Sequence, residues 1–152
     1  MTAVSAGKGT DGERAMIWTV RATLLGVALA LAAPAAAAEL PPLRENTHIN
    51  SRLLAAAVGD EIRRNCPSIS PRMFTVIREA RALESYALQA GYSRAEVEAF
   101  LRSRDERRRI RAERDGYLAR NGVVEGDAAS YCRLGQREIA DQTYIGSLLR
   151  AQ

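Results

Sequence analysis

Apolar side chains recur every three or four residues through most of the chain beyond residue 50, and this period predicts helices. The first helix is predicted from Ser51 to Asn65, because Leu54, Val58 and Ile62 fall one turn apart on one face. Asn50 stands immediately before this helix and has the side chain of a good N-cap.

The second helix is predicted to begin after Ser70, with Pro71 in the first helical position and Ile69 packing on Phe74 as a hydrophobic staple. Its apolar stripe would consist of Ile77, Ala80, Leu83 and Ala87. Gly91 is placed for the left-handed turn that ends many helices.

Two capping boxes follow, Ser93 with Glu96 and Ser103 with Glu106, and Asp127 is a further cap. The helices that these caps open are predicted at 94–102, from 104 to the Asn121-Gly122 pair, and beyond Asp127. No segment alternates with a period of two, and no stretch repeats another. The predicted fold is therefore an all-α, compact bundle of five or six short helices, preceded by a signal-peptide helix.

The first 38 residues have a different pattern. Residues 1–15 are polar and glycine-rich, and a start at Met16 gives a leader of ordinary length, so residues 1–15 are interpreted as an extension from a mis-assigned start. Residues 22–38 carry no charge and end in four alanines. A positive flank, an apolar stretch and small residues at the cleavage point predict a signal peptide at 16–38, cleaved after Ala38, and hence a periplasmic protein.

The strongly apolar part of this leader covers only ten residues. A membrane-spanning helix needs about 20 apolar residues, so cleavage is favoured and an uncleaved inner-membrane anchor is the alternative. Pro41 and Pro42 predict an extended segment at 39–49, which leads into a single helical domain at 50–152.

Cys66 and Cys132 are the two cysteines of the chain. In an oxidising compartment an even number of cysteines favours a disulfide, and two free buried thiols are the alternative.

The segment 102–115, RSRDERRRIRAERD, is the most basic part of the chain, with seven arginines and four acids. Its arginines are the candidate surface for an anionic partner: Arg102, Arg104, Arg107, Arg108, Arg109, Arg111 and Arg114. On a helix, opposite charges four residues apart are neighbours. Three such pairs are predicted, namely Asp105–Arg109, Arg109–Glu113 and Arg111–Asp115. The run largely neutralises itself, which favours a solvated helix, with weak binding to an anionic membrane surface or an acidic protein as the main alternative.

Nucleic-acid binding is disfavoured, because the run lacks a broad basic face and aromatic platforms for bases. Catalytic chemistry is also missing from the sequence. His48 is the single histidine and has no marked nucleophile partner, and the two cysteines lack both metal-ligand spacing and a CxxC motif. We therefore expect no catalytic residues, no metal and no cofactor.

Five blocks together resemble a family of small exported alphaproteobacterial proteins described as a domain of unknown function. They are PPLREN, VGDEIRRNCPSISPRM at 58–73, GYSRAEVEAF from Gly91, YCRLGQREIA from Tyr131 and the closing IGSLLR. The resemblance implies a periplasmic location and a Cys66–Cys132 pairing. Some members are labelled as the E subunit of NADH dehydrogenase, but a [2Fe–2S] cluster needs four thiolates and this chain has two.

The sequence thus predicts a non-catalytic periplasmic interaction or structural domain, cross-linked by one disulfide, that presents its fourth helix to an unidentified protein partner. One alternative is an enzyme or small-ligand binder whose site lies between helices and uses Tyr86, Tyr92, Tyr117, Tyr131 or scattered carboxylates. Another is a peripheral protein of anionic membrane surfaces.

Overall fold

The computed structural model describes residues 40–152. Their elements are, in chain order, the 3-10 turn η1 (Leu43–Glu45), α1 (Thr47–Asn65), β1 (Ile69–Pro71), α2 (Met73–Gln89), α3 (Arg94–Arg102), α4 (Arg104–Arg120), α5 (Ala128–Ala140), α6 (Tyr144–Ser147) and β2 (Leu149–Ala151). Six α-helices and one pair of short strands make up this part of the chain, which confirms the predicted all-α bundle. The extension at 1–15 and the signal peptide at 16–38 lie outside the described residues.

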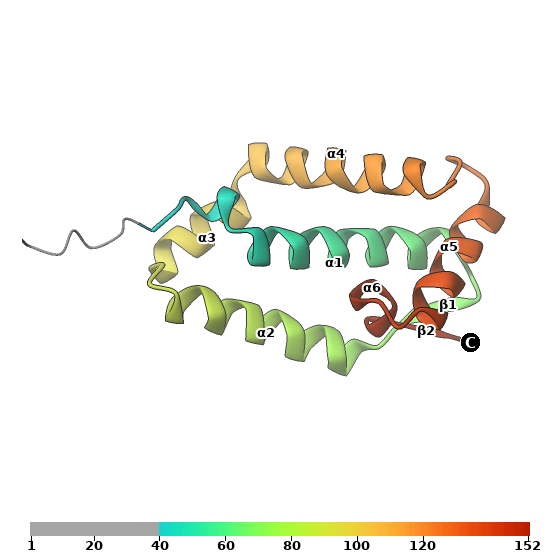
Figure 1. Ribbon diagram of the computed structural model, residues 1–152, viewed down its shortest axis with the longest axis horizontal. Helices are drawn as coiled ribbons and strands as arrows, with labels where there is room; N and C mark the ends of the chain where they lie inside the picture. Colours follow the sequence, from blue (N-terminus) through green and yellow to red (C-terminus); the bar gives the residue numbers. More distant parts are fainter. Residues whose placement is uncertain (1–39) are drawn as a thin grey trace, which may run out of the picture. The chain divides into compact units, whose positions relative to one another are not determined.

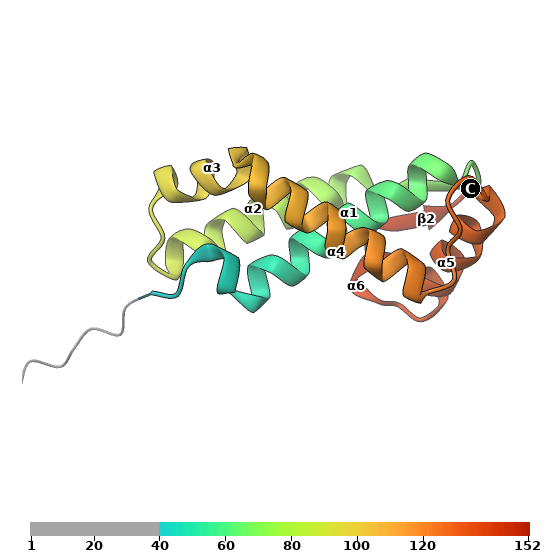
Figure 2. The same cartoon turned by 90° about the horizontal axis from the view of Figure 1, so that it is seen from above.

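Helix α1 is the centre of the bundle. Figure 1 shows it between α4 on one side and α2 on the other, with α5 near its C-terminal end and α6 between the middle of α1 and α2. Seen from above, α4 crosses over α1 at an angle, and α3 connects the far end of α2 to the start of α4 (Figure 2). Helix α1 therefore contacts α2, α4, α5 and α6, whereas α3 packs on α2 and α4.

The start of α1 differs from the prediction. The N-cap is Asn46, whose side chain accepts a hydrogen bond from the Ile49 N–H at 3.1 Å, so the helix begins four residues earlier than expected. Asn50 lies inside the helix, and its amide donates to the carbonyls of Leu43 and Asn46 instead. The extended lead-in is correspondingly shorter, and His48 belongs to the first turn of α1.

The start of α2 also differs. Ser70 and Pro71 do not open the helix, because Ile69–Pro71 pairs antiparallel with Leu149–Ala151, with Ser70 opposite Arg150. Ile69 is buried in the core and does not staple to Phe74, which is 92 % exposed. Helix α2 begins at Met73 without a side-chain cap. Pairing with the distant C-terminal strand has therefore overridden a strong local signal.

The other predicted boundaries are confirmed. Ser93 and Glu96 form a capping box at α3, Ser103 caps α4, and the Asp127 side chain accepts from the Ala129 N–H at 3.0 Å to cap α5. Gly91 lies in the turn that follows α2 and has a φ of 105°, a conformation that other residues rarely adopt.

The buried side chains form two separate clusters along α1. The larger one lies at its C-terminal end and includes Val58, Ile62, Leu134 and Leu149. The smaller one lies at its N-terminal end and consists of Leu43, Ile49, Ala87 and Tyr92. The core is therefore not continuous along the bundle.

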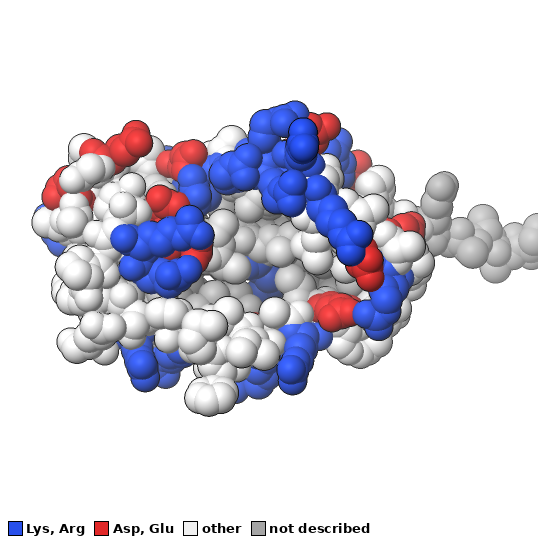
Figure 3. Space-filling model, turned by 180° about the vertical axis from the view of Figure 1, so that it is seen from behind, with Lys and Arg blue, Asp and Glu red and all other residues white. Residues whose placement is uncertain are grey.

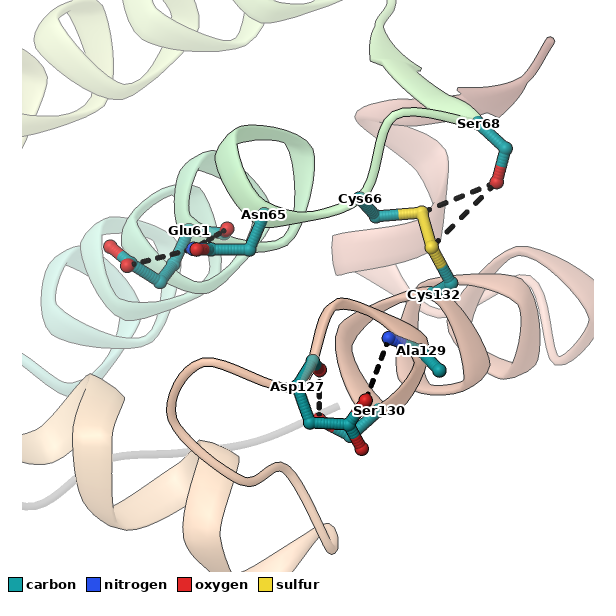
Figure 4. Close-up of a disulfide and its surroundings, with 8 residues drawn as sticks. All are labelled: Glu61, Asn65, Cys66, Ser68, Asp127, Ala129, Ser130 and Cys132. Atoms are coloured by element: carbon teal, nitrogen blue, oxygen red, sulfur yellow. Dashed lines mark hydrogen bonds between the residues drawn. A yellow bond between two sulfur atoms is a disulfide. The ribbon is translucent and has the colours of Figure 1, made fainter.

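A disulfide joins Cys66 and Cys132, with the Cα atoms 5.1 Å apart. Figure 4 shows it between the end of α1 and the first turns of α5, with the Ser68 hydroxyl close to both sulfur atoms. The predicted pairing is confirmed. Because 66 residues separate the cysteines, the bond ties the beginning of the helical domain to its last third.

Candidate functional site

An apolar cavity of about 500 Å³ lies open to the surface between α1, α2 and α3. Figure 3 shows the hollow on this face of the molecule. Its walls are mainly aliphatic, with Leu53 and Ala56 from α1 and Ala80 and Leu83 from α2. Ala56 and Ala80 are small and exposed, so no large side chain from either helix fills the space between them.

The cavity continues toward α4. A neighbouring space of about 330 Å³ is lined by α1, α3 and α4, and it shares Leu53, Phe100 and Leu101 with the first. Ile110 adds an apolar contact from α4. We call the two spaces together the groove. Its floor is α1, and its edges are α2 on one side and α4 on the other.

Helix α2 explains why the groove is open. The predicted apolar stripe consists of Ile77, Ala80, Leu83 and Ala87, but only Ala87 is buried. Ala80, Leu83 and Ala87 line the groove, whereas Ile77 is 43 % exposed on another part of the helix. An amphipathic stripe normally covers the core of its own domain. Here most of it faces an open space.

The acids that line the groove all have basic partners. Their ion pairs are Glu79–Arg78, Glu84–Arg94, Glu98–Arg102, Asp60 with Arg63 and Arg64, and Glu106 with Arg44 and Arg109. In contrast, Arg81 on α2 and Arg107 and Arg111 on α4 form no ion pair within residues 40–152. We call these three exposed side chains the rim arginines. They leave the groove with an uncompensated positive charge.

The predicted arginine surface on α4 divides into two sets. Arg102, Arg108, Arg109 and Arg114 are engaged in ion pairs. Arg109 and Arg114 are mostly buried and turn toward α1, where they bind Asn50 and Glu61. The remaining three, Arg104, Arg107 and Arg111, are exposed and form no ion pair in the described part of the chain.

Only one of the predicted pairs along the run is present, Arg109–Glu113 at 2.7 Å. Asp105 pairs with Arg108, three residues away, and Asp115 pairs with its neighbour Arg114. The run therefore neutralises itself through a different set of contacts, and it leaves one edge of α4 basic. Figure 3 shows this accumulation of basic side chains beside the hollow.

Glu106 is the buried centre of the contacts between α4 and the start of the domain. Its carboxylate accepts from Arg109 Nε at 2.8 Å and from Arg44 Nε at 3.0 Å. The hydrogen bonds from Arg109 and then from Arg44 lower the pKa of Glu106 below its ordinary value and outweigh the effect of burial. Ser103 caps α4 as predicted, but the predicted capping box is not formed, because the Glu106 carboxylate binds Arg44 and Arg109 instead.

A second cavity, of about 320 Å³, lies between α1, α4, α5 and α6. At its edge the buried carboxylate of Glu138 accepts hydrogen bonds from the hydroxyls of Tyr117 and Thr143. Burial, together with the hydrogen bond to this carboxylate, raises the pKa of Tyr117 to about 12. A phenol with this pKa stays protonated at neutral pH, so the cluster acts as a structural link between α4, α5 and α6.

The four tyrosines proposed for a ligand site are dispersed. Tyr86 stacks against His48 with ring centroids 4.3 Å apart, and Tyr92 donates to the Pro41 carbonyl at 2.7 Å. Tyr117 binds Glu138, and Tyr131 is buried in the larger cluster. None of the four lines the groove. Within residues 40–152, no group of metal-ligating side chains is present, and no helix is long and apolar enough to cross a membrane.

Sequence reasoning found the basic edge of α4 but missed the apolar groove beside it. The one signal for the groove was the pair of alanines in the stripe of α2, Ala80 and Ala87, because small residues cannot fill the distance to a facing helix.

Comparisons with known proteins identify a family for the chain but no activity. A family model described as a family of unknown function, DUF5333, matches residues 41–150. No curated protein and no solved structure matches the chain significantly.

Proposed function

We propose that this chain, which belongs to DUF5333, a family of unknown function, is a non-catalytic interaction domain that holds a partner protein in its groove. The observation that carries the proposal is an open apolar groove whose rim arginines have no acidic partner in the described residues. An exposed apolar surface rimmed by charged side chains is typical of an interaction site.

The proposed domain is non-catalytic because the polar side chains near its cavities, within the described residues, already bind one another. The lining acids are engaged by arginines, and Tyr117 and Glu138 bind each other. A catalytic site needs a nucleophile or base aimed at a space where a substrate can lie. The groove presents mainly aliphatic side chains to that space.

We further propose that the domain acts in the periplasm after export. Disulfides persist in oxidising compartments, and the Cys66–Cys132 bond supports this location. The intact mass of the protein from its native cell, alkylated with and without reduction, tests it. A chain that begins at Glu39 and takes up label only after reduction is expected. A full-length chain with two free thiols would place it in the cytoplasm or on the inner membrane.

Photo-crosslinking in the native cell tests the groove. A photo-reactive phenylalanine analogue at Ala80 lines the groove, and the same analogue at Ala112, an exposed position on α4 that does not line it, is the matched control. A discrete protein adduct is expected from Ala80 and not from Ala112. It should disappear when Ala56→Phe fills the groove. Equal adducts from both positions, or none from Ala80, would contradict the proposal.

The size of the groove favours small-ligand binding as a second candidate. Pockets for small molecules commonly measure about 300–1,000 Å³, and the larger space here has about 500 Å³. An environment-sensitive apolar dye that brightens on the wild-type protein, but not on Ala80→Phe, would support it, provided that the protein crosslinks no partner.

The exposed set Arg104, Arg107 and Arg111 favours a weak contact with anionic membranes as a third candidate. This contact predicts sedimentation with phosphatidylglycerol vesicles that fades as salt is added.

A further inference from the structure

We propose that the segment bound in the groove is an amphipathic helix whose flanks are acidic. This inference rests on the proposed function and adds the chemistry of the partner. It combines the apolar walls of the groove with the position of the rim arginines, Arg81, Arg107 and Arg111.

The charge of the groove selects an acidic partner. Seven arginines and five acids line its two spaces. Each of the five acids already has a basic partner, and the interaction of Arg52 with the Tyr144 ring, at 3.7 Å, occupies a further guanidinium. The rim arginines remain for a bound molecule to neutralise. A complementary partner therefore carries carboxylates on the sides that meet α2 and α4.

The distribution of the rim arginines argues for a peptide over a lipid or fatty acid. An amphiphile with one head group needs its cations together at one end of an apolar pocket. Here Arg81 stands on the α2 edge, while Arg107 and Arg111 stand on the α4 edge. Charges on both edges match a long ligand that carries acids along both of its flanks.

The walls of the groove argue for a helical peptide. Its floor and edges are helices, and α2 turns an apolar stripe toward the open space. A helix laid there with apolar residues at positions i, i+3, i+4 and i+7 would give that stripe the packing partner it lacks. The 17 residues of α2 correspond to about 25 Å of helix, which is enough for four to five turns of partner.

Three synthetic peptides, each as long as α2, test the inference by fluorescence anisotropy with the complete exported chain. The first has leucines on one face and glutamates on the others. The second has the same composition in an order without an apolar face, and the third has lysine in place of every glutamate. We expect the first peptide to bind at least tenfold more tightly than the other two. Equal binding of all three, or preference for the lysine peptide, would overturn the inference.

Variants of the protein then locate the interaction. Arg81→Gln, Arg107→Gln and Arg111→Gln together remove the three ion pairs expected with the bound peptide. At roughly twofold to threefold for each pair, binding of the acidic peptide should weaken about tenfold. The side chains have no ion pairs to lose, so the melting temperature should not change. Ala80→Phe fills the groove and should abolish binding while leaving the charges intact.

The control variant removes the same charge elsewhere, with Arg120→Gln, Arg133→Gln and Arg137→Gln, three positions that do not line the groove. It should bind within twofold of wild type. An equal loss in both triple variants would show a general effect of net charge and would overturn the inference.

The test separates this inference from the proposed function. A groove-specific crosslink from Ala80 without binding of the acidic peptide would leave an interaction domain whose partner is not an acidic helix. A protein that sediments as a dimer, and becomes monomeric in Ala80→Phe, would replace the partner with a second copy. Binding to phosphatidylglycerol vesicles that outcompetes the peptide would replace it with a membrane surface.

Discussion

Replacing Glu106 with glutamine tests whether one buried carboxylate holds α4 to the start of the domain. Its side chain is 10 % exposed and accepts charged hydrogen bonds from Arg44 and Arg109. Glutamine keeps the shape and one acceptor oxygen but removes the charge. Because Arg44 is itself 54 % exposed, its contribution is screened by water and most of the loss comes from Arg109.

We expect Glu106→Gln to lower the free energy of unfolding by about 2 kcal/mol at neutral pH, since charged hydrogen bonds of this kind are each worth about 1.5–3 kcal/mol before screening. Urea unfolding followed by circular dichroism measures the change. Glu98→Gln is the matched control, because Glu98 forms an exposed ion pair of the same type with Arg102. Its expected loss is under about 0.5 kcal/mol.

The pH dependence gives the sharper test. The pKa of Glu106 is lower in the folded protein than in the unfolded chain. Its contribution is therefore fully present above the unfolded pKa and is lost as the pH falls through the folded pKa. The difference between wild type and Glu106→Gln should begin to shrink as the pH falls below the unfolded glutamate pKa of about 4.3, and it should vanish below the lower, folded pKa. A difference that persists unchanged as the pH falls, or one no larger than that of the control, would refute the reasoning.

Three further outcomes are expected. Reducing the Cys66–Cys132 bond, which spans 66 residues, should destabilise the domain by about 4 kcal/mol, measured by urea unfolding with and without reductant. Gly146→Ala should cost about 3 kcal/mol in the same assay, because a Cβ at this position meets the Glu138 carbonyl in the backbone of α5. Phenolate absorbance should show an ionisation near pH 12 that is absent in Tyr117→Phe, and the stability from this phenol should be present below about pH 10 and decline as the pH rises through 12.

The sequence predicts those boundaries that local chemistry decides. The capping box at Ser93, the cap at Asp127 and the left-handed Gly91 each depend on side chains within three or four residues, and all three are confirmed. The disulfide was predictable because the chain has only two cysteines.

Boundaries that distant contacts decide were not predictable. Asn46 and Asn50 are equally good caps by residue type, and Asn46 also reaches the Tyr92 hydroxyl, 46 residues away, at 3.4 Å. Ser70 was a strong cap signal, but its segment pairs with a strand about 80 residues later. Three-residue strands are too short to show a period of two, so nothing local signals the pair.

The groove shows a further limit of pattern reading. The period of α2 correctly indicated an apolar stripe, but periodicity does not say whether the surface opposite that stripe belongs to the same domain. The division of the arginine run has the same cause. Arg109 and Arg114 turn inward because they bind Asn50 and Glu61 on α1. The spacing of residues within α4 cannot predict these partners.

The same distant contacts explain why the groove stays open. At the N-terminal end of α2, strand β1 pairs with β2, and Arg72 donates from its backbone N–H to Leu148 and from Nε to Leu149, both at 2.8 Å. At the other end, Tyr92 anchors the turn after α2 to Pro41. With both ends held, α2 cannot move onto α1 to bury its stripe. A partner would meet a preformed groove, so little of its binding energy would be lost to rearranging the domain.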